Sequence, residues 1–174
     1  MSPRFVLPLA VVGALIALFV AGLQRDPQLL PSPLIGRAAP AFSLPAVPAA
    51  AARVSPADFR GQPVLVNFFA SWCVECVAEH GALQELARHA QVRLVGIDYK
   101  DTDEHVRRWL AERGNPYSVV VADHEGSAGL DWGVYGVPET FLVGADGRIL
   151  AKHVGPLTEA VFQAELAPHL AAPR

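Results

Sequence analysis

The sequence has very few lysines and no cluster of basic residues. Only Lys100 and Lys152 occur among its 174 residues, and the formal net charge is −3. A nucleic-acid-binding face needs concentrated positive charge to neutralise phosphates, so the composition argues against a nucleic acid partner. The chain also lacks internal repeats, and its one biased stretch is the alanine-rich "AVPAAAAR" near residue 50. The length suits one ordinary domain with an additional segment at the N-terminus.

Cysteine is equally scarce, since Cys73 and Cys76 are the only two and both lie in "NFFASWCVECVAEH". A structural disulfide between them would close a very short ring and remove little loop entropy from the unfolded chain. A metal site would need further ligands, for which His80 and the distant His153 are candidates. Structural zinc usually shows two cysteine or histidine pairs, and only one is present. A redox-active pair is therefore favoured, with no metal bound.

The N-terminal run from Phe5 to Leu23 contains no charged residue. A helix over this run would be about 28 Å long at about 1.5 Å per residue, close to the hydrocarbon thickness of a bilayer. The run is longer than a typical signal-peptide core, and no clean cleavage site follows it. The sequence thus predicts a short N-terminus at 1–4, a transmembrane helix at 5–23, a proline-rich linker at 24–39 and a domain at 40–174. A cleaved signal peptide is the alternative.

Apolar runs and helical periodicity alternate along the domain. "VLVNFFA" is typical of a buried, parallel strand, and apolar residues from Cys73 onward recur at helical spacing. The order indicates parallel strands joined by helices and then a hairpin, which forms a mixed central sheet flanked by helices. The predicted elements are strands at 64–70, 92–99 and 117–122, a hairpin at 140–154, and helices from 73 onward, from 102 to 113 and from 158 to 170.

Cys73 falls where the first buried strand ends and a helix begins. Unpaired backbone N–H groups and the helix dipole favour an anion at that position, which promotes the thiolate. Cys76 lies one turn on, within disulfide reach. We therefore expect Cys73 to attack a foreign disulfide and Cys76 to resolve the mixed disulfide, with Trp72 covering the pair.

A second motif, "GVYGVPETF", comes just before the hairpin. In a thioredoxin-like arrangement it places Val137 and Pro138 across from the cysteines. A cis bond before Pro138 would present the Val137 backbone to an extended client peptide, with Glu139 next to it. Val137, Pro138 and Glu139 are therefore predicted, together with Trp72, to bind the substrate.

Taken together, "NFFASWCVECVAEH", "GIDYKD", "GNPY" and "GLDWGVYGVPETF" resemble the CcmG/DsbE family over about residues 36–172. The resemblance implies a thioredoxin-like α/β fold anchored in the inner membrane by a single-pass helix, with its domain in the periplasm. It implies no cofactor besides the redox-active disulfide. The client would be the haem-binding cysteine pair of apocytochrome c or a partner thiol protein, and a membrane electron donor of the CcdA/DsbD type would re-reduce the domain.

One departure from the family pattern is the pair Val74-Glu75 between the cysteines, where a proline usually precedes the second cysteine. Carboxylates near Cys73 disfavour its thiolate, which makes the couple more reducing. Glu79 is predicted to exchange a proton during the reaction. Glu75 is a second supporting candidate, although a solvated helix-face charge that complements the helix N-terminus is the favoured interpretation. Asn67 occupies the position of a buried aspartate in thioredoxin and cannot carry a proton.

Three other functions remain compatible with an anchored thioredoxin-like domain. A copper chaperone or assembly factor would bind metal through two cysteines and a distant histidine, but with wider cysteine spacing. A periplasmic oxidant would need a low Cys73 pKa, against which the acids argue. A general periplasmic disulfide reductase would share every motif.

Overall fold

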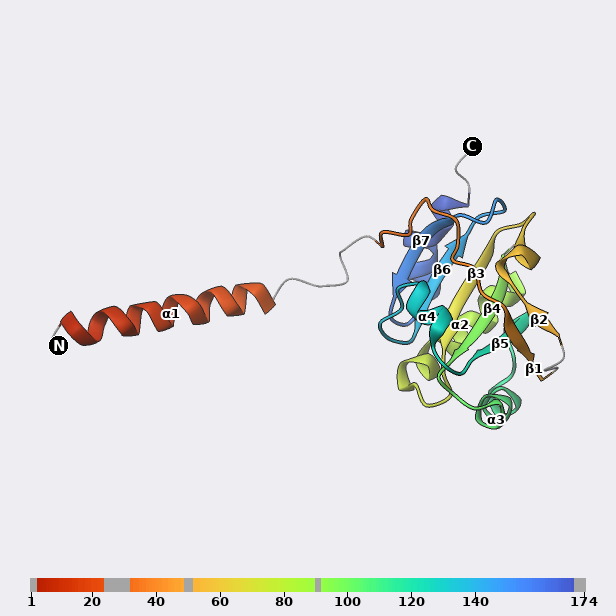
Figure 1. The fold of residues 1–174 in the computed structure, drawn as a ribbon, viewed down its shortest axis with the longest axis horizontal. Coiled ribbons are helices and arrows are strands. Elements are labelled where there is room, and N and C mark those ends of the chain that lie inside the picture. Colours follow the sequence, from red (N-terminus) through yellow and green to blue (C-terminus); the bar gives the residue numbers. More distant parts are fainter. Residues whose placement is uncertain (1–2, 24–31, 49–51, 90–91, 171–174) are drawn as a thin grey trace. The chain divides into compact units, whose positions relative to one another are not determined.

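The computed structural model describes residues 3–23, 32–48, 52–89 and 92–170. The chain forms two compact units, Met1–Pro31 and Ser32–Arg174. In the first unit, the helix α1 spans Pro3–Leu23 and contains the whole charge-free run (Figure 1). Its described apolar side chains are exposed, among them Ile16 and Phe19. Within the described residues, no helix meets the combined length and hydropathy needed to cross a membrane.

The second unit is built on one seven-stranded mixed sheet. Its strands are β1 (Leu44–Val47), β2 (Arg53–Val54), β3 (Val64–Phe69), β4 (Arg93–Tyr99), β5 (Val119–Asp123), β6 (Glu139–Val143) and β7 (Ile149–Val154). They lie in the order β2-β1-β5-β4-β3-β6-β7. The central strands β3, β4 and β5 run parallel, and the β6–β7 hairpin joins antiparallel to β3. The predicted mixed sheet is confirmed.

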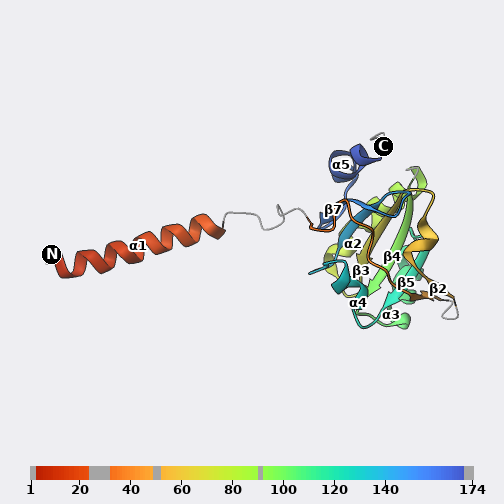
Figure 2. The same ribbon diagram turned by 45° about the horizontal axis from the view of Figure 1, so that its top comes forward.

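The helices are α2 (Val74–His89), α3 (Asp103–Arg113), the short α4 (Ser127–Asp131) and α5 (Glu159–Val161). Thr102 caps α3, since its side chain accepts a hydrogen bond from the backbone N–H of His105. Side chains of α2, α3 and the C-terminal segment pack on one face of the sheet, while α4 lies toward the other. Figures 1 and 2 show α3 and the C-terminal helical segment at opposite ends of this unit.

The strand β3 divides two apolar cores because its side chains alternate between the two faces of the sheet. All six of its residues are buried. Leu65 and Phe69 join the core that contains both cysteines, and Val66 and Phe68 join the core around Trp132 on the opposite face. The alternation also sends the one polar residue of the strand, Asn67, toward the side of the cysteines.

The C-terminal segment differs from the single helix predicted over 158–170. Thr158 caps α5, but a π-helical turn follows at Phe162–Leu166 and a 3-10 turn at Ala167–His169. Pro168 has no backbone N–H and its ring excludes a regular α-helical turn before it, which accounts for the change.

The structured unit also begins earlier than residue 40. Ala38 forms a bridge with Arg148, and the backbone N–H of Gly36 donates to the carbonyl of Ile149. The end of the expected linker is therefore paired along the start of β7, while residues 24–31 lie outside the described part. The sequence pattern also missed β1, β2 and α4.

Candidate active site

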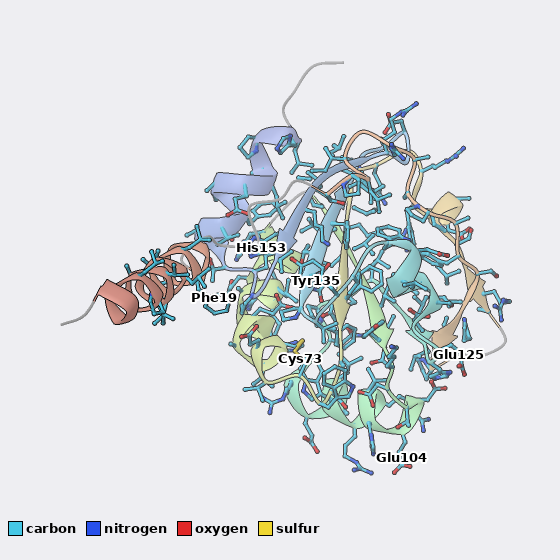
Figure 3. All side chains as sticks on the ribbon, turned by 60° about the vertical axis from the view of Figure 1, so that its left-hand side comes forward. Phe19, Cys73, Glu104, Glu125, Tyr135 and His153 are labelled. Atoms are coloured by element: carbon cyan, nitrogen blue, oxygen red, sulfur yellow. A yellow bond between two sulfur atoms is a disulfide. The ribbon has the colours of Figure 1, made fainter. Side chains whose placement is uncertain are left out.

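The two cysteines lie at the N-terminal end of α2, directly after β3. They form a disulfide with their Cα atoms 5.3 Å apart (Figure 3). Both are buried, with 5% of Cys73 and 1% of Cys76 exposed. The backbone N–H of Cys76 donates to Sγ of Cys73 at 3.0 Å. This donor is one of the unpaired N–H groups of the first helical turn, a position suited to stabilising a thiolate on Cys73 in the reduced form.

The loop before β6 faces the first cysteine. The bond between Val137 and Pro138 is cis, as the sequence predicted, and the carbonyl oxygen of Val137 lies 3.4 Å from Sγ of Cys73. An extended peptide that pairs with the Val137 backbone would therefore bring its own sulfur next to Cys73.

Three exposed apolar side chains surround this position. Trp72 is 57% exposed, Val74 84% and Tyr135 70%. The indole N–H of Trp72 donates to the carbonyl of Lys100 at 3.3 Å, which holds the ring over the loop after β4 instead of leaving it free. Exposed aromatic and aliphatic groups beside a reactive sulfur are suited to contact a client protein.

Glu79 lies on the buried side of α2, one turn after Cys76, and is 1% exposed. Asn67 Nδ2 donates to its Oε1 at 3.0 Å, and the backbone N–H of Leu157 donates to its Oε2 at 2.8 Å. Burial raises the pKa of Glu79 to about 7, partly offset by these two hydrogen bonds. A carboxyl group with a pKa near neutrality is suited to exchanging protons at physiological pH.

Glu139 is fully buried and does not reach the surface around the cysteines. Its Oε1 accepts hydrogen bonds from the backbone N–H groups of Tyr135 and Gly136, and its Oε2 lies 2.8 Å from Nζ of Lys152. The structure therefore places Glu139 under the loop that carries Val137, and a direct contact with a client is not available to it.

Within the part of the chain that the structure describes, the remaining polar candidates do not form a cluster with the cysteines that could hold a metal. Glu75 is exposed on α2, as a solvated helix-face charge would be. Nε2 of His80 lies 2.9 Å from the Gly114 carbonyl, and Nδ1 of His153 lies 2.8 Å from Oε2 of Glu165. Among the described residues, no group of three or more His, Cys, Asp or Glu is placed to hold a metal ion.

Two buried polar residues were not singled out from the sequence. The hydroxyl of Tyr117 donates to Oδ1 of Asn67 at 2.8 Å. Asp98 is fully buried on β4, opposite Phe69, and neither of its oxygens has a hydrogen-bond partner within the described residues. Burial, with Asp101 adding to it, raises the pKa of Asp98 to about 8. Only the position of Asp98 in a run that is otherwise typical of a buried strand could have drawn attention to it.

The chain is similar in sequence to known thiol:disulfide interchange proteins. Residues 34–166 match the Redoxin family. The chain is 44% identical over 170 residues to the thiol:disulfide interchange protein DsbE of Allochromatium vinosum, covering 98% of this chain and 94% of the relative. It is 43% identical over 172 residues to the thiol:disulfide interchange protein HelX of Rhodobacter capsulatus, covering 98% and 97%.

Solved structures show the same fold. A crystal structure from Chlorobium tepidum that carries the DsbE name superposes with a TM-score of 0.66 at 27% identity, covering 77% of this chain and 96% of that one. A secreted thiol-disulfide isomerase from Corynebacterium glutamicum has the same TM-score at 19% identity, covering 76% and 85%, and supports the fold alone. With a buried cysteine pair at a helix start opposite a cis-proline, this chain is a thioredoxin-like thiol–disulfide oxidoreductase that belongs to the Redoxin family and, within it, to the CcmG/DsbE family.

Proposed function

We propose that the protein is a reductant of cytochrome c maturation. Its client would be the oxidised haem-binding cysteine pair of apocytochrome c or a partner thiol protein. The observation that carries the proposal is the Val137 carbonyl 3.4 Å from Sγ of Cys73, beside the cis bond to Pro138. This arrangement suits an extended peptide with a disulfide, and the DsbE and HelX relatives are named as thiol:disulfide interchange proteins.

The reaction would proceed by two exchanges of sulfur partners. The Cys73 thiolate attacks one client sulfur, the client S–S bond breaks, and the other client sulfur leaves as a thiolate. Cys76 then loses its proton and attacks Cys73, which forms the Cys73–Cys76 disulfide and releases the second client sulfur. The client gains two electrons and two protons in total. Glu79, one turn after Cys76, is the group that we assign to take up and return a proton.

The acids around the cysteines favour the reducing direction. The Cys76 backbone N–H lies 3.0 Å from Sγ of Cys73 and would stabilise negative charge there. An ionised carboxylate at Glu75, between the cysteines, or at Glu79, one turn after Cys76, would disfavour a thiolate nearby. A less stable thiolate makes the dithiol a stronger reductant. Outside the cytoplasm such a dithiol needs an electron supply, for which a membrane donor of the CcdA/DsbD type is proposed.

The reduction potential of the Cys73–Cys76 couple tests the direction. The full chain, in mild detergent, would be equilibrated with glutathione and the reduced fraction measured. A value well below about −180 mV, toward the roughly −270 mV of thioredoxin, agrees with a reductant. A value near the roughly −120 mV of a strong oxidant would reverse the assigned direction.

Trapping the mixed disulfide tests the client. Cys76→Ser leaves Cys73 without its resolving partner, so an oxidised peptide with a Cys-x-x-Cys-His sequence should accumulate as a covalent adduct. The competitor is the same peptide with more residues between its two cysteines. Cys73→Ser is the control that should form no adduct. Equal trapping of both peptides would favour a general periplasmic disulfide reductase.

We also propose that the domain faces the periplasm and that residues 5–23 anchor it to the inner membrane. The support is the absence of any charged residue from Phe5 to Leu23 and the exposure of apolar side chains along α1. Fractionation of cells that express the full chain, followed by carbonate extraction and protease treatment of spheroplasts, tests it. A chain found in the soluble fraction, or protected from the protease, would contradict it.

Titration of the reduced chain with copper distinguishes a copper chaperone from a disulfide reductant. A reduced domain that acts as a chaperone binds copper stoichiometrically through Cys73 and Cys76, and His153 would be its third ligand. In this fold His153 pairs with Glu165. We expect His153→Ala to leave any copper binding unchanged.

A further inference from the structure

A buried chain of hydrogen bonds links Tyr117 to the carboxyl group of Glu79. The Tyr117 hydroxyl donates to Asn67 Oδ1 at 2.8 Å, and Asn67 Nδ2 donates to Glu79 Oε1 at 3.0 Å. All three residues are buried. They come from the segment before β5, from β3 and from α2, so tertiary folding alone brings them together.

The direction of each hydrogen bond is fixed by chemistry. An ionised carboxylate only accepts, so Asn67 must turn its Nδ2 toward Glu79. Its Oδ1 then faces Tyr117, whose hydroxyl must donate. If the carboxamide turned over, Nδ2 would face the tyrosine oxygen and the phenolic proton would lose its acceptor. A buried donor without an acceptor costs free energy, so the tyrosine opposes this turn.

We infer that Tyr117 is a positioning residue, which holds the Asn67 carboxamide in one orientation and thereby keeps a hydrogen-bond donor on Glu79. Its hydroxyl also polarises the amide, which strengthens the bond that Nδ2 makes. The second hydrogen of Asn67 Nδ2 is donated to Thr140 Oγ1 at 3.0 Å. Because a hydroxyl can also donate, Thr140 does not by itself select the orientation. The inference deepens the proposed function, because it concerns the group assigned there to exchange a proton.

Charged groups on several elements act on this chain of hydrogen bonds. Glu75, on the same helix, raises the pKa of Glu79 in addition to burial, while the Leu157 N–H and Asn67 lower it. Burial, with Glu79 and then Asp98, raises the pKa of Tyr117 well above its ordinary value, so its hydroxyl stays protonated. No ion pair among the described residues involves Glu79. After burial and the Leu157 N–H, the Asn67 hydrogen bond is the next cause of the Glu79 pKa shift, and it is the one that the side-chain orientation of Asn67 controls.

The test variant is Tyr117→Phe, which removes one oxygen and keeps the ring that stacks on Phe69 at 4.8 Å between centroids. Without the hydroxyl, Asn67 leaves Oδ1 unpaired in its present orientation and Nδ2 unpaired in the flipped one. The preference for the orientation in which Nδ2 donates to Glu79 therefore weakens. We expect the titration midpoint of Glu79, the pH at which half of its carboxyl groups are ionised, to rise by roughly half to one pH unit. Tyr99→Phe, outside this chain of hydrogen bonds, is the matched control.

The midpoint would be read from side-chain carboxyl carbon NMR of the full chain, assigned with Glu79→Gln. The disulfide form is used, so no thiol titrates. A raised midpoint in Tyr117→Phe alone supports the inference, and an unchanged one overturns it. The pH profile of peptide reduction is then measured on the same variants. A raised Glu79 midpoint with an unchanged profile would keep the inference and remove the proton role of Glu79.

Two further measurements do not depend on the stability of Tyr117→Phe. In the unaltered chain, the Asn67 Nδ2 protons should titrate with the same midpoint as Glu79, and absence of that titration contradicts the inference. Asn67→Asp keeps the side-chain shape but replaces the donor with an oxygen. It should raise the Glu79 midpoint further than Tyr117→Phe does, and a lowered midpoint would overturn the hydrogen-bond directions assigned above.

Discussion

The backbone N–H of Leu157 donates to Oε2 of Glu79 at 2.8 Å, across 78 positions of sequence. The bond joins the segment after β7 to the helix that begins at the cysteine pair. Both oxygens of Glu79 therefore have a donor, and neither donor carries a charge. The carboxyl group is held in place, yet it remains easy to protonate because it is buried.

Replacing Glu79 by Gln should change both stability and chemistry. Glutamine has one acceptor oxygen, so its NH₂ group would face either the Leu157 or the Asn67 donor, and we expect a loss of about 1–3 kcal/mol in the free energy of unfolding. The pH profile of peptide reduction should also shift. Glu85→Gln, on the exposed side of the same helix and outside the surroundings that shift the pKa of Glu79, is the matched control. A Glu79→Gln profile that superimposes on that of the parent would remove Glu79 from the mechanism.

The contribution of the buried carboxyl groups of Glu79 and Asp98 to the stability of the folded chain should fall as pH rises from about 4 to about 8. The pKa values of Glu79 and Asp98 are raised on folding, to about 7 and about 8. At pH values between the unfolded-state and the folded-state pKa of these two carboxyls, the folded state therefore binds more protons than the unfolded state. The stabilisation is complete below the unfolded pKa, and it is lost as pH rises to the folded pKa. Each carboxyl contributes a slope of at most about 1.4 kcal/mol per pH unit.

Asp98→Asn isolates one of these two slopes. The amide keeps the shape of the side chain and does not ionise, so the variant should lose less stability between pH 5 and 8 than the parent does. Urea unfolding at several pH values measures it. Asp131→Asn, at an exposed position on α4, should leave the slope unchanged. A parent slope retained in Asp98→Asn would show that Asp98 does not bind the extra proton.

Removing only one partner of the buried ion pair between Glu139 and Lys152 should strongly destabilise the fold. Lys152→Met leaves a buried carboxylate under the loop of Val137, and the expected loss is about 3–5 kcal/mol. Lys100→Met, at an exposed lysine, controls for lost charge. Glu139→Gln combined with Lys152→Met should recover part of the loss, because no charge is then stranded. An additive double variant would show that the pair is not coupled.

Two glycines should respond to alanine in opposite ways. A Cβ at Gly96 would lie 2.8 Å from Cε1 of Phe69 and 2.9 Å from Cγ of Tyr117, so Gly96→Ala should cost about 1–3 kcal/mol. Gly81 is in the exposed part of α2, where a Cβ would meet no atom within 4 Å, and Gly81→Ala should stabilise the chain by up to about 1 kcal/mol. Thermal unfolding of both variants is the measurement. A stable Gly96→Ala would mean that the two rings move easily.

The sequence was most informative where periodicity and chemistry agree. The buried run of β3 and the helical spacing of α2 are local signals, and both are found in the fold. The position of Val137 beside Cys73 can be expected only once the thioredoxin-like arrangement is inferred, because it depends on the packing of that fold and not on a local signal. By contrast, β1 has only four residues and contains Pro45, so it has no alternation long enough to detect. The break in the C-terminal helix depends on Pro168, which does not disturb the apolar periodicity of that segment.

The polar interior could not be predicted in the same way. Glu139 follows the cis-proline in sequence, which suggested a contact with the client. Side chains alternate along a strand, so Glu139 lies on one face of the sheet while Thr140 and Asn67 lie on the other. The link from Tyr117 to Asn67 spans 50 positions and has no local pattern. Hydrogen bonds of this kind depend on the register of strands that are distant in sequence.

The two lysines differ in accessibility, with consequences for chemical labelling. The side chain of Lys152 is 8% exposed and paired, whereas Lys100 is exposed in the loop whose carbonyl accepts the indole N–H of Trp72. An amine-reactive cross-linker should therefore modify the folded domain at Lys100, in the loop that holds the indole of Trp72. A zero-length or short cross-linker would then report proteins bound at this face, including clients released too quickly to be caught as disulfides.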